Sequence, residues 1–144
     1  MKCFECGKGK LIQRQTEVEG EVRGELFAVQ SAALVCDRCG HQAMEGADLP
    51  EHLRALADAY RRAHRLLTSE EIRLRRKSLR MTQKNFAAYL GVGEASIKRW
   101  ELGAIQDDSM DRYIRLKTDP KEAQLNALHV AQLLDSKARS HTTR

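Results

Sequence analysis

Residues 69–103 read SEEIRLRRKSLRMTQKNFAAYLGVGEASIKRWELG, and this stretch decides the fold of the C-terminal half. Its pattern predicts three short helices. The first covers about 69–78, the second is TQKNFAAYL with Thr82 as its N-terminal cap, and the third is EASIKRWE, which ends at Gly103. Gly91 and Val92 form a tight turn between the second and third helices. Two short helices joined by such a turn are typical of a DNA-binding helix-turn-helix, in which the later helix reads the bases.

The apolar residues of this stretch are expected to form the core of the domain. They are Leu79, Met81, Phe86, Ala87, Leu90, Val92, Ile97 and Trp100. Trp100 is interpreted as a packing residue rather than as a platform for base stacking. Glu101 is expected to pair with an arginine of the first helix, and at least half of the basic run 73–77 to cover a solvated helix face.

The side of the third helix that does not face the core is left for DNA, since the N-terminal residues of a reading helix approach base edges. Arg99 is the first candidate for bidentate contact with guanine. Ser96 can reach a base or a phosphate, Ala95 a thymine methyl, and Lys98 a phosphate or a base. Glu94 repels phosphate unless it accepts a hydrogen bond from cytosine N4. It therefore either selects a particular operator sequence or lies off the groove.

Four cysteines form two C-x2-C pairs near the N-terminus, Cys3 with Cys6 and Cys36 with Cys39. Each pair places two thiolates on one side of a tight loop, and two such loops close a tetrahedral Zn–S4 site. A glycine follows the second cysteine of each pair and can take the positive φ that turns backbone N–H groups toward the sulfurs. The sequence therefore predicts one structural Zn²⁺ ion with these four ligands.

Other uses of the four cysteines are disfavoured. A disulfide does not suit a chain expected in the cytoplasm, and a redox C-x-x-C needs one pair near a βαβ pattern rather than two matched pairs. Four cysteine ligands leave no open position for a water, which argues against catalytic zinc. His41, two residues after Cys39, is a substitute ligand or, as we expect, a surface residue.

The 29 residues between Cys6 and Cys36 exceed the spacing of short zinc ribbons, so they must form structure of their own. Polar and apolar residues alternate there, and Gly20 and Gly24 are candidate turn positions. This pattern predicts two or three short antiparallel strands. A unit of about 48 residues buries little core. Bound zinc would then stabilise its fold by an amount on the order of 10 kcal/mol.

Residues 47–50 mark a boundary, and Pro50 suits the first turn of a helix. From there to about Leu67 the apolar residues keep a helical period, while Arg54, Arg61, Arg62 and Arg65 cover other faces. The expected organisation is a zinc-binding domain over 1–48, a linker helix over 49–68, and a helix-turn-helix and dimerisation domain over 69–144. The fold class is α+β, with short strands in the first domain and five helices in the last.

Two further helices are predicted after the helix-turn-helix. One covers roughly 108–118 and is capped within 107–109, and the other starts at Pro120. The second carries an apolar stripe of Ala123, Ala127, Leu128, Ala131 and Leu134. This stripe either packs on its own domain or contributes to a dimer interface. Residues 136–144 are largely polar and are expected to fray.

The net charge of +5 is unevenly distributed. Residues 1–48 carry six Lys/Arg against eight Asp/Glu, and residues 69–118 carry eleven against seven. An acidic N-terminal part and a basic C-terminal part indicate different partners. The basic part suits the phosphate backbone of a nucleic acid.

Several classes of protein are disfavoured by what the sequence lacks. There is no apolar run of 18 residues and no apolar segment behind the first methionine, so we expect a cytoplasmic protein with no membrane contact. There is also no His-x-Glu metal motif and no glycine-rich phosphate loop, so we do not expect an enzyme.

The stretch TQKNFAAYLGVGEASIKRWELG resembles the Cro/repressor-type helix-turn-helix family. The chain as a whole resembles the MqsA/YgiT family of antitoxins, in which a zinc domain starting M-K-C-x-x-C precedes a linker and this type of domain. The resemblance covers about residues 1–118. By the family pattern, Thr82, Gln83 and Lys84 begin the second helix near the DNA backbone and are assigned to phosphate contacts.

The resemblance implies a dimeric repressor that binds a palindromic operator in its own promoter and neutralises a partner toxin, often an mRNA-cleaving RNase, with its N-terminal domain. The acidic zinc domain would suit a small basic toxin. The first function is therefore that of a type II antitoxin. The alternative is a stand-alone regulator of the same architecture without a toxin. An RNA-binding zinc-knuckle protein is disfavoured by the acidic N-terminal domain and the few aromatic residues.

Overall fold

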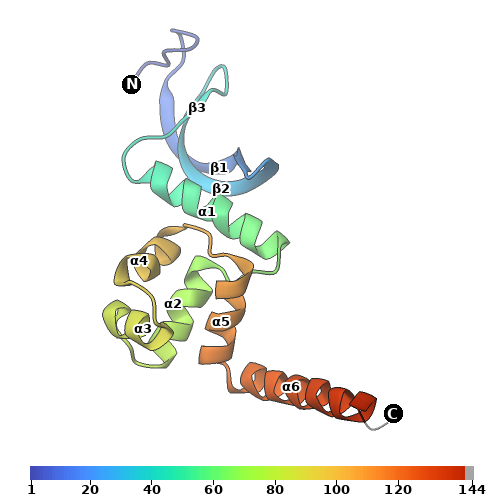
Figure 1. Ribbon diagram of the computed structural model, residues 1–144. Helices are drawn as coiled ribbons and strands as arrows, with labels where there is room; N and C mark the ends of the chain where they lie inside the picture. Colours follow the sequence, from blue (N-terminus) through green and yellow to red (C-terminus); the bar gives the residue numbers. More distant parts are fainter. Residues whose placement is uncertain (142–144) are drawn as a thin grey trace. The chain divides into compact units, whose positions relative to one another are not determined.

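The computed structural model describes residues 1–141, which form a small antiparallel sheet followed by six helices (Figure 1). The predicted α+β class is confirmed. The chain divides into two compact units, the first made of 1–71 with 99–105 and the second of 72–98 with the residues from 106 onward. Within the described residues, no helix combines the length and the apolar character needed to cross a membrane.

The sheet is one long antiparallel hairpin with a short third strand. β1 (Leu11–Val22) and β2 (Glu25–Cys36) have 12 residues each and pair along their whole length. Arg23 and Gly24 make the turn, with φ values of 50° and 83°, the two positive values that a type I′ turn requires. β3 (Gln42–Ala43) lies beside β2. The two main strands are therefore longer than predicted, because the alternation of polar and apolar residues continues through Gly20 in β1.

α1 (Asp48–Ala63) packs on the hairpin, mainly against β2 (Figure 1). Gly20 permits the close approach, since a side chain at that position would overlap the side chain of Leu56. Nearer the start of the helix, Ser31 Oγ lies 2.8 Å from His52 Nδ1 in a buried contact. The helix is thus an integral part of the first unit.

α1 ends four residues before the predicted end at Leu67. Arg65 takes a left-handed φ of 58°, and the N–H of Leu66 donates to the Arg61 carbonyl at 2.8 Å, which closes the helix. Leu66 and Leu67 are nevertheless buried. The apolar period therefore continues beyond the helix because a connecting segment, rather than another helical turn, buries these two leucines.

The three helices of the helix-turn-helix lie where the sequence predicts them. They are α2 (Ser69–Ser78), α3 (Gln83–Leu90) and α4 (Glu94–Leu102). The hydroxyl oxygen of Thr82 caps α3 by accepting a hydrogen bond at 3.1 Å from the backbone three residues on. Gly91 ends α3 with a φ of 73°. Local capping signals therefore fix both ends of this helix.

The core of the second unit is made of large apolar side chains. Its buried residues include Ile72, Phe86, Ala87, Leu90, Ile97 and Ile114. Met81, Val92 and Trp100, all expected in the core, are half-buried. The prediction for Leu79 is wrong: its side chain is 37% exposed, because α2 ends at Ser78 and the following turn directs it outward.

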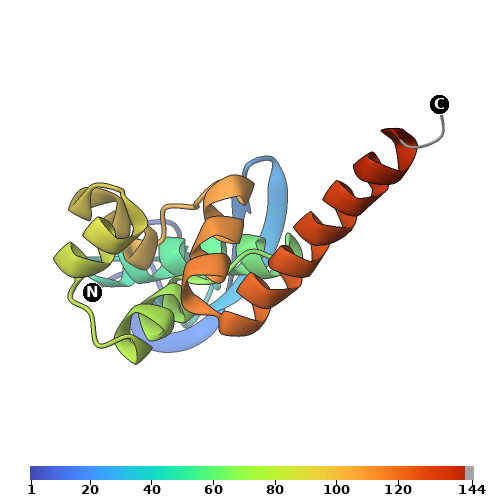
Figure 2. The same ribbon diagram turned by 60° about the horizontal axis from the view of Figure 1, so that its bottom comes forward.

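Two more helices complete the five that were predicted for the C-terminal part. α5 (Asp108–Thr118) is capped by Asp107, whose carboxylate accepts a hydrogen bond from the N–H of Met110 at 2.7 Å. α6 (Pro120–His141) follows as one long helix (Figure 2). The prediction that residues 136–144 fray is wrong for 136–141, which are helical, and residues 142–144 lie outside the described residues.

The apolar side chains of α6 are exposed. Leu128 and Leu134 of the predicted stripe are 56% and 63% exposed. Packing of this stripe on its own domain, one of the two expectations, is therefore wrong, because the helix extends beyond the core that α2 to α5 enclose.

Candidate metal centre and nucleic-acid interface

The four cysteine sulfurs come together, with all four within 4.8 Å of one another. Sγ of Cys3 lies 3.7 Å from Sγ of Cys39, and Sγ of Cys6 lies 3.7 Å from Sγ of Cys36. A tetrahedral ion with bonds of about 2.3 Å to sulfur separates its ligands by about 3.8 Å. The four predicted ligands therefore fit a single tetrahedral metal ion.

Both cysteine pairs sit in the same kind of turn. The N–H of Gly7 donates to the Cys3 carbonyl at 2.9 Å, and the N–H of Gly40 donates to the Cys36 carbonyl at 3.1 Å. The two glycines have φ values of 66° and 74°, in the left-handed region that favours glycine. The positive φ predicted for the glycine after each pair is confirmed.

Backbone N–H groups stabilise the ionised form of two of the thiols. Hydrogen bonds from the N–H groups of Lys8 and Gly9 lower the pKa of Cys6 to about 6. The N–H groups three and two residues after Cys36, at 3.5 and 3.4 Å from its sulfur, lower the pKa of Cys36 in the same way. Because metal ions bind the thiolate and not the thiol, the two loops favour the form that a metal needs.

Cys39 behaves differently from these two. The N–H of His41 favours its ionised form, but lost solvation and the other three thiols outweigh that effect and raise the pKa of Cys39 to about 12. A bound cation would favour all four thiolates together. His41 is not among the clustered ligands, and its ring packs edge-on against Phe4 with the centroids 5.5 Å apart.

Most of the side chains predicted to contact DNA are accessible. On α4, Ile97 is fully buried and Trp100 is half-buried, as the predicted inward orientation requires. The remaining predicted residues of this helix are Glu94, Ala95, Lys98 and Arg99, which are exposed, and Ser96, which is half-buried. At the start of α3, the predicted residues are Thr82 and Lys84, which are exposed, and Gln83, which is half-buried.

Three of these side chains, Glu94, Lys98 and Thr82, take part in the following intramolecular contacts. Glu94 Oε1 lies 3.5 Å from Lys98 Nζ, an ion pair one helical turn apart on the surface of α4. The oxygen of Thr82 is used in the cap of α3, which leaves its O–H as a donor for another group. Glu94 is therefore not an isolated negative charge on α4.

Sequence reasoning missed a buried ion pair on α1. Arg61, expected on a polar face, has no exposed surface, whereas Leu53 of the expected apolar stripe is 55% exposed. Arg61 follows Ala57 by four residues and so continues the buried face, and Asp58 stands three residues before it as a partner. This spacing of Asp and Arg on an apolar face is the signal in the sequence that indicates the pair.

A comparison with protein families supports the antitoxin resemblance. The family described as the antitoxin component of the bacterial toxin–antitoxin system, MqsA, matches residues 1–131. A search among curated proteins gives no match. The family match includes the four cysteines, the hairpin and all of α1 to α5. This chain belongs to the MqsA family of antitoxin components of bacterial toxin–antitoxin systems.

Proposed function

We propose that this antitoxin represses its own operon by binding a palindromic operator as a homodimer, and that its zinc-bound N-terminal part neutralises a toxin in the cytoplasm. The observation that carries the DNA-binding part is the surface of α4. Burial of Ile97 turns the side chains of Lys98 and Arg99 to solvent, as a reading helix requires.

In the proposed complex α4 lies in the major groove. Arg99 donates two hydrogen bonds to guanine, Ala95 contacts a thymine methyl, and Ser96 reaches a base or a phosphate. Lys98 attracts phosphate less strongly than an isolated lysine, because Glu94 lies 3.5 Å from its ammonium group. The same pair reduces the repulsion between Glu94 and the DNA.

The start of α3 is proposed to contact the DNA backbone. Thr82, Gln83 and Lys84 lie at the N-terminus of this helix, where the helix dipole favours an anion. Lys84 adds a full positive charge. These contacts would fix the register of α4 without reading sequence.

We infer that the metal is Zn²⁺. Thiolates are soft ligands, and four of them in tetrahedral positions are typical of structural zinc. Such a site leaves no open position for a water or a substrate, so the ion is assigned to stability and not to catalysis. Elemental analysis of the purified protein should give one zinc per chain, and Cys39→Ser should lower that ratio while Glu5→Gln leaves it at one.

The toxin is proposed to be a small basic RNase. The acidic balance of residues 1–48 suits a protein that carries positive charge to hold RNA.

The homodimer is proposed to use α6, whose large exposed apolar side chains are Leu125, Leu128, Val130, Leu133 and Leu134. Two copies would place two α4 helices in successive major grooves, about 34–36 Å apart.

Fluorescence anisotropy with labelled DNA from the antitoxin's own promoter tests the DNA-binding part. Arg99→Ala should weaken binding by about 1–3 kcal/mol, the value of one good bidentate base contact. Lys84→Ala should reduce the slope of log K against log salt by about 0.9, the value for one lost phosphate contact. Lys2→Ala, an exposed lysine outside the proposed DNA-binding and dimer elements, is the control and should change neither. Equal binding by wild type and Arg99→Ala would refute the assignment of Arg99.

A further inference from the structure

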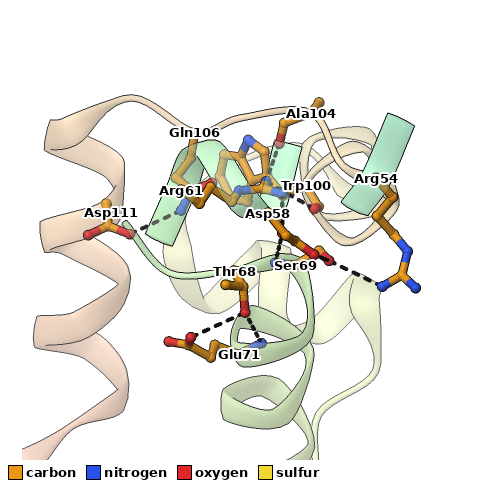
Figure 3. A network of polar contacts seen from close by, with 10 residues as sticks. All are labelled: Arg54, Asp58, Arg61, Thr68, Ser69, Glu71, Trp100, Ala104, Gln106 and Asp111. Atoms are coloured by element: carbon orange, nitrogen blue, oxygen red, sulfur yellow. Dashed lines mark hydrogen bonds and ion pairs between the residues drawn. The ribbon is translucent and has the colours of Figure 1, made fainter. Parts of the chain in front are cut away.

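Two charged residues of α1 are buried together. Arg61 Nη1 lies 3.0 Å from Asp58 Oδ1, and the arginine has no exposed surface (Figure 3). Removing two such charges from water is costly, and an apolar pair of similar volume often gives equal or greater stability. Stability alone therefore does not account for this pair, and the remaining contacts of the two side chains show what else they do.

The Arg61 guanidinium caps the C-terminal end of α4. Its Nη2 donates to the carbonyl of Trp100 at 3.2 Å and also to the carbonyl of Ala104 (Figure 3). Carbonyls at a helix C-terminus lack partners within the helix, and a positive charge there is favourable. The Trp100 carbonyl also accepts from the N–H of Gly103 at 3.2 Å, and Arg61 adds from α1 a charged donor to it and to a carbonyl just beyond the helix.

Asp58 caps the start of α2 in the complementary way. Its two carboxylate oxygens accept from the backbone N–H of Ser69 at 2.8 Å and from the Ser69 hydroxyl at 2.6 Å. Thr68 adds a local cap, because its hydroxyl oxygen accepts from the N–H of Glu71 at 3.2 Å. One ion pair therefore holds the beginning of the first helix and the end of the reading helix of the helix-turn-helix.

The end of α4 also lies directly against the backbone of α1. A Cβ built on Gly103 would be 3.2 Å from the Arg54 Cα, and Gly103 has a φ of 121° that side chains rarely adopt. A larger residue would be strained by its backbone conformation and would press against the Arg54 backbone. This second observation, independent of the ion pair, places the end of α4 at a fixed point on α1.

We propose that Asp58 and Arg61 are positioning residues for DNA recognition, which hold the C-terminal end of α4 on α1 so that its reading side chains keep one orientation. This inference rests on the proposed operator binding. Arg99, the proposed guanine reader, lies one residue before the carbonyl of Trp100 that Arg61 binds. Loosening of this helix end would therefore displace the Arg99 side chain, on which sequence recognition is proposed to depend.

The test compares DNA affinity with stability in the full-length, zinc-loaded protein. The variants are Arg61→Met, the double variant Asp58→Leu with Arg61→Met, and Arg62→Met as a control that removes the same charge from an exposed neighbour. Affinity for promoter DNA is measured by fluorescence anisotropy, at a temperature where circular dichroism shows each variant to be folded. Thermal melting is measured in parallel.

Arg61→Met should weaken promoter binding about tenfold relative to Arg62→Met. Its slope of log K against log salt should match wild type, because a buried arginine contacts no phosphate. The double variant should recover thermal stability, since it leaves no unpaired buried charge. Its DNA affinity should stay low, whereas a purely structural role would restore affinity together with stability.

Two results would overturn the inference, and they are distinguishable. Wild-type affinity in the folded double variant would show that the ion pair does not position α4, while operator binding itself would stand. Failure of both wild type and Arg62→Met to bind the promoter would remove the proposed function, and the positioning role with it.

Discussion

The hairpin and the helix-turn-helix differ in what stabilises each of them. The buried apolar cluster at the base of the hairpin is small and consists of Cys3, Leu11 and Cys36, so two of its three members are proposed metal ligands. The second unit buries Phe86 together with several isoleucine and leucine side chains. A metal ion is thus expected to do in the first region what a hydrophobic core does in the second.

Removal of the metal should change stability more than any single substitution in the helical core. Chelation, or Cys36→Ser, should destabilise the hairpin by an amount on the order of 10 kcal/mol. α3 should stay helical because its core contains no metal ligand. Amide resonances of β1 and β2 in a nitrogen–proton NMR spectrum should collapse while those of α3 persist. Glu5→Gln, beside the ligands but exposed, should leave the spectrum intact, and an ordered hairpin after chelation would contradict the comparison.

Truncation of the apolar core should produce the opposite pattern. Phe86 is fully buried, and Phe86→Ala should lower the free energy of unfolding of the helix-turn-helix by about 3–5 kcal/mol. Urea denaturation curves measure this loss. Elemental analysis of the folded variant should still give one zinc per chain. Leu74→Ala removes a side chain that is 55% exposed and should cost far less. Loss of zinc in Phe86→Ala would show that the two regions are not separately stabilised.

The caps of the helical region should contribute smaller amounts. Asp107→Ala removes the acceptor for the N–H of Met110 and should cost about 1 kcal/mol. Asp108→Ala, the exposed neighbour within the first turn of α5, should cost only a few tenths through the helix dipole. Urea denaturation followed by circular dichroism measures both. Equal losses would mean that charge near the helix end, and not the hydrogen bond, stabilises α5.

The smallest effect should be a pH dependence of the free energy of unfolding that arises from His52, where α1 packs on the hairpin. Burial lowers the pKa of His52 below its ordinary value of 6.5, so the unfolded chain takes up its proton more readily than the folded one. The free energy of unfolding should therefore fall as pH decreases below 6.5. His52→Asn keeps a polar group near Ser31 but cannot titrate, so it should lose less stability between pH 7.5 and 5.5. Both proteins share the pH dependence of the thiolates, and identical losses would exclude His52 as the cause.

The same contrast explains what the sequence predicts and what it does not. The cysteine pairs, the Thr82 cap and the turn at Gly91 are local patterns whose chemistry depends on a few neighbours, and the structure has them as predicted. The length of the hairpin was underestimated because pairing between distant strands decides where a strand ends. Burial of Arg61 likewise depends on partners some 40 positions away in the chain, so its residue type, and not its helical position, led to the wrong expectation of a polar face.

We propose that the zinc-binding part of this antitoxin holds a toxin and that its helix-turn-helix reads DNA, and a growth assay tests this division most directly. The gene adjacent in its operon is induced from one plasmid and the antitoxin is supplied from another. We predict that the adjacent product arrests growth, and that wild type and Arg99→Ala both restore it while Cys36→Ser does not. Absence of arrest, or a loss of rescue with Arg99→Ala and not with Cys36→Ser, would contradict the claim.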